Sequence, residues 1–264
     1  MRWKYIGWIA SVSVILLFFY VGAWHLNTAN SEIIAHRFND YQEILGDFGS
    51  VYYSCCHIIK GPSYFPKAVV KNSAGEVLYS WRFTNFLNGP VPYQNLRGSN
   101  WTASIVSRVR NTTPILYSPV DSGNGSFNTS VFAVAMSGSA FDESTVMDVR
   151  HIPGDLVLFA DVYDSNTHWM QPGDFDSSTV PEELRVARGL GNESYSGFFL
   201  AFADGEIWYM TDKTPIAEVK KFFTVTGARE NRRESVLRNY LQMKQHSDLY
   251  RSFVPISRKQ VITN

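Results

Sequence analysis

A chain of 264 residues with 45% hydrophobic and 18% charged residues has enough apolar surface for a packed core, which excludes a disordered chain. The formal net charge is zero, so the composition does not indicate nucleic-acid binding, which needs a concentrated basic surface. Aromatic residues make up 15% of the chain and, together with many β-branched residues, favour β-sheet in its body.

The N-terminus carries a strongly apolar segment. Residues 6–24 contain no charged side chain, and they follow Arg2 and Lys4. A helix of this length rises close to the ~30 Å needed to cross the hydrocarbon layer of a bilayer. The positive-inside rule therefore predicts residues 1–5 in the cytoplasm, a single span of the cytoplasmic membrane at residues 6–24, and the rest of the chain outside, in the periplasm.

A cleaved signal peptide is the alternative interpretation of this segment. Val21-Gly22-Ala23 resembles a small-residue cleavage site, and residues 6–20 would then be the apolar core of the signal. A core of this length is at the upper limit for signal peptides, and Trp24 is an unfavourable residue after a cleavage site. We therefore favour a retained membrane anchor.

The segment after the anchor, residues 25–60, is predicted to be a helical stalk. Residues 31–53 repeat apolar side chains at steps of three and four, which indicates an amphipathic helix able to continue the membrane helix. Cys55 and Cys56 are adjacent, and a disulfide between neighbours closes only a strained ring. With His57 they lack a fourth ligand for a metal, so we favour burial or an intermolecular disulfide.

The body of the chain, residues 61–228, is predicted to be a globular domain of short strands. An Asn-Ser-Ala-Gly turn at residues 72–75 joins two apolar runs into a predicted hairpin. A short helix is expected around residues 104–109, in a stretch otherwise rich in Gly, Pro, Ser and Asn. The strand-like runs are residues 68–71, 76–79, 81–83, 130–135 and 156–160.

The clearest local signal is a second hairpin, at residues 198–210. Asp204-Gly205 joins its two apolar runs, and a type I′ turn needs positive φ at both central residues, a conformation that this dipeptide favours. A Thr-Pro helix start then predicts a helix over residues 215–223. A last helix is expected over residues 231–245 from its apolar face.

This order of elements predicts an α+β fold. A transmembrane helix continues into an amphipathic helix packed on an antiparallel sheet, and helices follow at the C-terminus in a basic helical extension, residues 229–264. A helix that leaves the membrane and packs on such a sheet is the pilin-like plan, although element order alone does not establish a function.

Charge is unevenly distributed along the chain. Residues 141–183 contain ten acidic side chains and one basic side chain, whereas residues 229–264 contain eight basic and three acidic ones. Two interpretations stay open at this point. The two segments form separate solvated surfaces, or they contact each other within one molecule or between neighbours.

Candidate sites for chemistry are few. Trp101 and Trp169 suggest sugar stacking, although large aromatic residues more often fill a core. We find no nucleophile elbow, phosphate-binding loop or His-Glu-x-x-His motif, so the sequence predicts a protein without catalytic activity and without a cofactor. Oxygen-rich side chains that offer a weak calcium site are Asp161, Asp164, Asn166, Asp174 and Asp176.

Four segments of the globular part share their order and spacing with one known family. They are Ser80-Trp81-Arg82, residues 129–141 (TSVFAVAMSGSAF), residues 168–174 (HWMQPGD) and residues 202–207 (FADGEI). They resemble the SWR, Y-V-A-V-x-G-x-x-x-A-F, P-W-T-x-P-x-D and F-x-D-G-S-V segments of domain-of-unknown-function family 1559, which is abundant in planctomycetes.

The resemblance covers roughly residues 69–226 and implies a divergent member of a family of pilin-like, secreted or anchored proteins. It implies no catalytic residues. Family members start with a prepilin signature that contains a Glu, whereas Gly7 is followed here by Trp-Ile-Ala-Ser-Val without one.

Two functions from different classes are therefore expected. The first is a membrane-anchored structural or assembly protein whose charged faces contact copies of itself or other envelope proteins. The alternative is an anchored envelope module that binds a carbohydrate or another ligand through exposed tryptophans.

Overall fold

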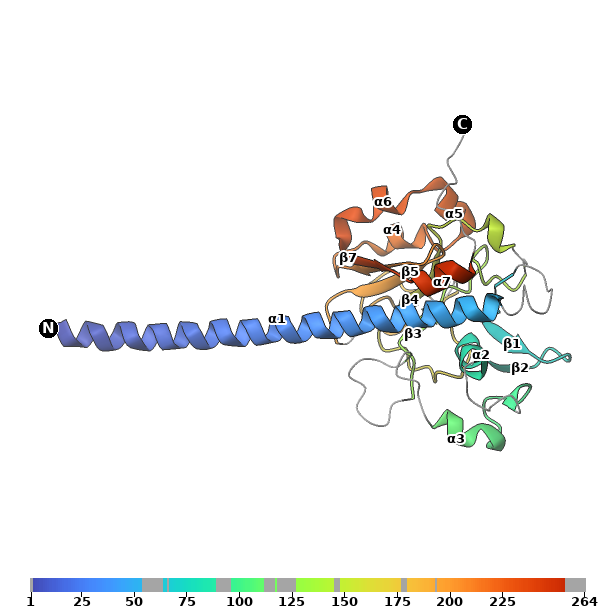
Figure 1. Ribbon diagram of the computed structural model, residues 1–264, viewed down its shortest axis with the longest axis horizontal. Helices are drawn as coiled ribbons and strands as arrows, with labels where there is room; N and C mark the ends of the chain where they lie inside the picture. The colour runs from blue at the N-terminus through green and yellow to red at the C-terminus, as the bar shows by residue number, and fades with distance from the viewer. Residues whose placement is uncertain are drawn as a thin grey trace. The chain divides into compact units, whose positions relative to one another are not determined.

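The computed structural model describes most of the 264-residue chain (Figure 1). The described residues are 2–53, 64–65, 67–88, 96–111, 117, 127–144, 148–176, 180–192 and 194–254, with side chains from Thr28 onwards. The Cys55, Cys56 and His57 group lies outside them. The chain divides into two compact units, Met1–Arg37 and Phe38–Asn264.

Helix α1 extends from Arg2 to Tyr53, so the two predicted N-terminal helices are one element. Its apolar face is fully buried from Phe38 onwards, with Tyr41, Leu45 and Phe48 at 0% exposure. This confirms the predicted amphipathic helix. Within the range whose side chains are described, no helix is both long and apolar enough to cross a membrane; residues 6–24 precede that range.

The core of the second unit is a five-stranded antiparallel sheet with the strand order β3-β4-β5-β6-β7. Antiparallel pairing and alternating faces suit strands connected through turns and loops. The α+β class and the antiparallel sheet are therefore as predicted. The strands are β3 (Val131–Ala133), β4 (Val157–Asp161), β5 (Phe198–Phe202), β6 (Glu206–Met210) and β7 (Leu241–His246).

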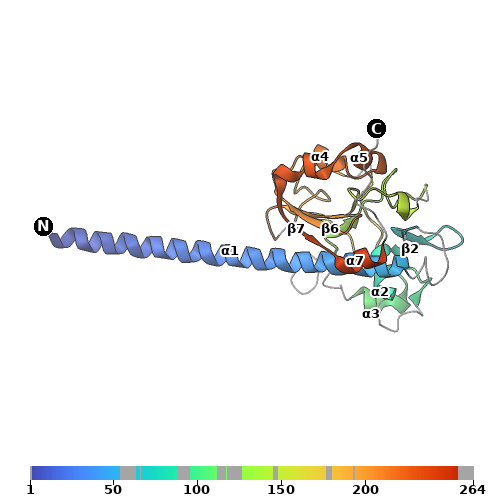
Figure 2. The ribbon, with the colours of Figure 1, turned by 45° about the horizontal axis from the view of Figure 1, so that its top comes forward.

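Helices cover both faces of this sheet (Figures 1 and 2). On one face, α1 packs through Phe38 and Tyr41 against Phe199, at ring-centroid distances of 4.7 and 5.5 Å. The opposite face is covered by α4 (Ile216–Lys220), α5 (Val225–Glu230) and α6 (Arg233–Val236). The predicted helix at 215–223 thus corresponds to α4.

The first predicted hairpin is confirmed as a separate two-stranded sheet of β1 (Val69–Lys71) and β2 (Val77–Ser80). The expected strand at residues 81–83 is wrong, because these residues begin helix α2 (Trp81–Asn88). The helix turns Trp81 towards Phe48 and Phe83 towards Trp169. A strand would have placed both side chains on the same face.

The predicted last helix, residues 231–245, is wrong in its second half. After α6 and a short 3-10 turn at Arg238–Tyr240, the chain forms β7, which pairs with β6 from Glu206↔His246 to Met210↔Leu241. Unpaired backbone groups on the edge of β6 are satisfied by this strand, which outweighs the local helical pattern. The remaining short helices are η3 (Ser104–Val106), α3 (Ser107–Arg110), η5 (Val149–His151) and α7 (Asp248–Phe253).

Helix α7 packs closely on α1. A Cβ atom on Gly46 would lie 2.8 Å from the Leu249 Cδ2 atom, and one on Gly49 would lie 3.1 Å from the Tyr250 ring. Glycine in a helix interior costs stability relative to Ala. Here the two glycines let the second helix approach, so the C-terminal segment is held against α1 as well as against β6.

Candidate functional site

The most developed polar cluster surrounds the turn between β5 and β6. The predicted type I′ turn is wrong, because Gly205 has a φ of 83° whereas Asp204 has no positive φ. Asp204 Oδ1 accepts a hydrogen bond from the Glu206 backbone N–H at 3.0 Å. The turn positions both carboxylates at one end of the hairpin. Asp204 and Glu206 are 5% and 3% exposed, which is unusual for acidic side chains and requires partners.

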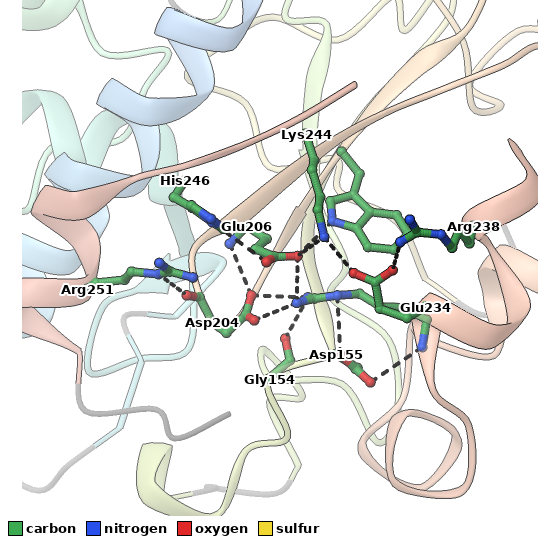
Figure 3. Close-up of polar contacts among 11 residues, drawn as sticks. Gly154, Asp155, Asp204, Glu206, Glu234, Arg238, Lys244, His246 and Arg251 are labelled. Atoms are coloured by element: carbon green, nitrogen blue, oxygen red, sulfur yellow. Dashed lines mark hydrogen bonds and ion pairs between the residues drawn. The ribbon is translucent and has the colours of Figure 1, made fainter. Parts of the chain in front are cut away.

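Arg233, at the start of α6, supplies those partners. Figure 3 labels the acidic residues around it, Asp155, Asp204 and Glu206. The guanidinium donates to Asp204 Oδ1 and Oδ2 at 3.0 and 2.5 Å, and it lies 2.9 Å from Glu206 Oε2 and 3.3 Å from Asp155 Oδ1. The Gly154 carbonyl accepts a further hydrogen bond at 3.2 Å. One buried cation thus joins three carboxylates from two separate segments.

Aromatic rings complete the surroundings of Arg233. Its guanidinium carbon lies 4.4 Å from the centre of the Phe202 ring and 5.3 Å from that of Trp208. The Trp208 Nε1–H donates to Glu206 Oε2 at 2.9 Å. Cation–π contacts of this kind are stronger when the cation is desolvated.

Three further side chains form the solvent edge of the cluster (Figure 3). Lys244 Nζ lies 2.6 Å from Glu234 Oε1 and 4.0 Å from Glu206 Oε2. His246 Nδ1 lies 3.7 Å from Glu206 Oε1. In the register of β6 with β7, His246 lies opposite Glu206 and Lys244 lies opposite Trp208.

The electrostatics favour a charged network. Burial lowers the pKa of Arg233, but the charges of Asp204 and Glu206 raise it by more, so its guanidinium keeps its proton. Burial raises the pKa of Asp155, against the opposing effect of Arg233. Partial burial raises the pKa of Glu234, but its hydrogen bonds from Lys244 and Arg238 outweigh this and lower it.

Chemically, this arrangement fixes the C-terminal segment to the hairpin. Two more contacts act in the same direction: Tyr250 donates to the Ala203 carbonyl at 2.9 Å, and Arg251 Nε donates to the Asp204 carbonyl at 2.9 Å. A buried ion pair is weak evidence for added stability, whereas these contacts all join the hairpin to residues 233–251. We therefore interpret the cluster as a joint between segments.

Sequence reasoning did not identify Arg233, Glu206 or Asp155 as a site. The signal was present in the uneven charge, because Asp155 lies in the acidic segment and Arg233 in the basic one. The structure brings these segments into contact within one molecule, and Arg229 Nη2 adds a hydrogen bond to the His151 carbonyl at 2.8 Å.

The calcium candidates are dispersed over internal contacts and turns. Asp161 is fully buried and accepts hydrogen bonds from the Tyr41 hydroxyl at 3.0 Å, from the Phe199 N–H at 3.0 Å and from the Tyr195 hydroxyl. Asp164 and Asn166 occupy left-handed turn positions, with φ values of 41° and 43°. In the described part of the chain, no group of three or more His, Cys, Asp or Glu side chains is arranged to hold a metal ion.

Asp174 and Asp176, the two remaining candidates, lie two residues apart in the chain segment after Trp169. Asp174 Oδ1 accepts hydrogen bonds from Trp81 Nε1 at 3.0 Å, Arg82 Nη1 at 2.7 Å and the Ala133 N–H at 2.9 Å. Its carboxylate is thus committed to a buried pair with Arg82. Asp176 lies two residues further on and is half-buried.

The two tryptophans proposed for sugar stacking differ in exposure. Trp169 is fully buried, and Trp101 is half-buried, with its ring centre 5.3 Å from that of His168. His168 Nδ1 accepts a hydrogen bond from the Met170 N–H at 3.2 Å, so its Nε2–H donates to the Arg110 carbonyl at 3.1 Å. Burial lowers the pKa of His168. Trp169 is thus part of the core and unavailable for stacking on a ligand, which weakens the binding hypothesis, whereas Trp101 and His168 are only half-buried.

Comparisons of the chain with protein-family models, with curated proteins and with solved structures give no match. The resemblance to family 1559 therefore stays a prediction, which rests on the four segments quoted above.

Proposed function

We propose that this chain is a membrane-anchored, pilin-like structural or assembly protein without catalytic activity, held outside the cytoplasmic membrane by residues 6–24. One observation carries the proposal. Helix α1 continues without a break from Arg2 to Tyr53, so the apolar N-terminal segment and the buried stalk belong to one element.

The remaining support comes from the use of the polar side chains. Buried charges of the second unit are committed to pairs inside the domain, as in Arg82 with Asp174 and Arg233 with Asp204. A helix packed on one face of an antiparallel sheet fits the pilin-like plan, and the four-segment resemblance points to the same class of protein.

The test uses the full chain expressed in a Gram-negative bacterium. We expect it in the membrane fraction after an alkaline wash, with an intact or Met-trimmed N-terminus. A Leu16→Arg, Leu17→Arg variant should move to the soluble fraction, because a charge near the centre of a span costs about 2.5–3.5 kcal/mol. The matched control is Ala29→Arg, outside the predicted span, which should stay in the membrane.

The mature N-terminus separates the models. A start just after Gly7 would support prepilin-type processing and a pilus-like assembly. A start after Ala23, or a wild-type chain in the soluble fraction, would contradict the proposed anchor.

A further inference from the structure

The charged residues in the part of α1 that belongs to the second unit are all acidic. Residues 38–53 contain Asp40, Glu43 and Asp47 and no Lys or Arg. Glu43 and Asp47 are exposed one helical turn apart, and neither has an ion-pair partner among the residues that the structure describes. Like charges four residues apart on a helix repel each other, so this arrangement is locally unfavourable.

Basic side chains without carboxylate partners lie across the sheet. Arg229 at the end of α5 and Arg232 just before α6 are exposed, and no described carboxylate pairs with either. Arg229 donates to the His151 carbonyl. Helices α5 and α6 cover the face of the sheet opposite α1 (Figures 1 and 2). Within the described residues, Glu43 and Asp47 thus lie on one side without ion-pair partners, and Arg229 and Arg232, with the exposed Glu230 between them in sequence, lie on the other.

We propose that the Glu43–Asp47 side of α1 docks against the Arg229–Arg232 surface of a second copy of this chain. The inference rests on the proposed function and names the partner of its assembly. Guanidinium groups pair with carboxylates in a planar, two-bond geometry. Because the two surfaces differ and lie on opposite faces, the contact is head to tail and repeats from copy to copy.

The contact is expected to be salt-dependent, because exposed ion pairs are screened. Sedimentation of the full-length wild-type chain in detergent micelles should show oligomers at about 50 mM salt and mostly monomers at about 500 mM, where the Debye length is shorter. Wild type that is monomeric at low salt would overturn the proposal.

Charge reversal gives the sharper test. Glu43→Lys with Asp47→Lys makes both surfaces basic, and Arg229→Glu with Arg232→Glu makes both acidic. We expect each double variant alone to lose association at least about tenfold, the change that follows from 1.4 kcal/mol. An equimolar mixture of the two should recover wild-type association, because each then meets an opposite charge.

The matched control reverses two exposed cations elsewhere, Lys67→Glu with Arg108→Glu, and should associate like wild type. A mixture that does not recover, or a control that also loses association, would contradict the proposed surface. Thermal melting of every variant verifies folding. Membrane fractionation tests the anchor independently of association. A chain that is in the membrane but monomeric overturns only the proposed docking, whereas a wild-type chain absent from the membrane overturns the proposed function.

Discussion

Two buried arginines, Arg82 and Arg233, differ in what surrounds them. Arg82 is fully buried, pairs with one carboxylate, Asp174, and otherwise donates to backbone carbonyl oxygens of Val131, Trp169 and Gln171. Arg233 faces three carboxylates and one carbonyl, and the excess negative charge is balanced at the solvent edge, where Lys244 is 36% exposed.

The comparison separates two ways of stabilising a packed segment. The Arg82 pair is closed off from solvent, and without its cation the Asp174 carboxylate would keep the neutral donors Trp81 Nε1–H and Ala133 N–H. The Arg233 cluster is open on one side, where the charge of the part-exposed Lys244 stays near Glu206 if Arg233 is removed. The first three predictions below test this difference, and the fourth tests an exposed carboxylate on α1; they run from the largest expected effect to the smallest.

Arg82→Met should give the largest loss. It leaves the Asp174 carboxylate buried without its cation, and its Oδ2 atom already lacks a hydrogen bond in the described structure. We expect the free energy of unfolding to fall by about 3–5 kcal/mol, measured by urea denaturation. Arg185→Met, at an exposed position, is the control and should change little. A loss under 1 kcal/mol would contradict the greater sensitivity that we assign to the Arg82 pair.

Arg233→Met should cost less, about 1–3 kcal/mol, which is the range for leaving buried polar groups without a partner. In the variant, Asp204 still accepts the hydrogen bond from the Glu206 N–H, and Glu206 still accepts that from the Trp208 ring N–H and lies near Lys244. Urea denaturation at low and high salt measures the loss in the free energy of unfolding. An effect equal to that of Arg82→Met would show that the cluster is as closed as the Arg82 pair.

Gly205→Ala tests the turn that carries the Arg233 cluster. Gly205 and Gly75 share a φ of 83°, but a Cβ on Gly205 would lie 2.9 Å from the Tyr250 ring, whereas one on Gly75 would meet nothing within 4 Å. Both substitutions should cost about 1 kcal/mol for the left-handed backbone, and Gly205→Ala should cost more because α7 must shift. Equal thermal shifts for the two variants would rule out the Tyr250 contact as a constraint.

Asp47→Asn should have the smallest effect, and one that depends on pH. Partial burial and then the charge of Glu43 raise the pKa of Asp47 from 3.8 to about 6. The folded state therefore binds more protons than the unfolded state in this window, so the contribution of this group to stability falls as pH rises through it. The variant cannot ionise, and its melting temperature relative to wild type should increase between about pH 4 and about pH 7.

Asp148→Asn is the control of opposite sign. Hydrogen bonds from Arg150 lower the pKa of Asp148 to about 2, so its carboxylate favours the folded state above its unfolded pKa of 3.8, and removing it should not stabilise at neutral pH. A pH-independent difference between Asp47→Asn and wild type would contradict the assigned cause. Because Asp47 is solvent-accessible, screening keeps the effect small.

The sequence alone determined the elements that depend on the spacing of apolar residues or on the residues of one turn. The apolar spacing of residues 31–53 predicted the buried face of α1, because a helix places every third and fourth side chain on one side. Asp204-Gly205 predicted the β5–β6 hairpin but not its turn type, because only Gly205 of the two has a positive φ. The alternating and apolar runs at residues 130–135 and 156–160 predicted β3 and β4.

Tertiary structure decided the secondary structure of those segments whose sequence pattern is compatible with either a helix or a strand. Trp81–Asn88 became a helix because two clusters of aromatic residues lie on different sides of it, and Leu241–His246 became a strand because β6 offered unpaired backbone groups. The Arg233 cluster depends on Asp155, Asp204 and Arg233, which are far apart in sequence. Uneven charge indicated that such segments meet, but only packing fixed which carboxylates share one guanidinium, because Coulomb attraction has no preferred direction and hydrogen-bond geometry does.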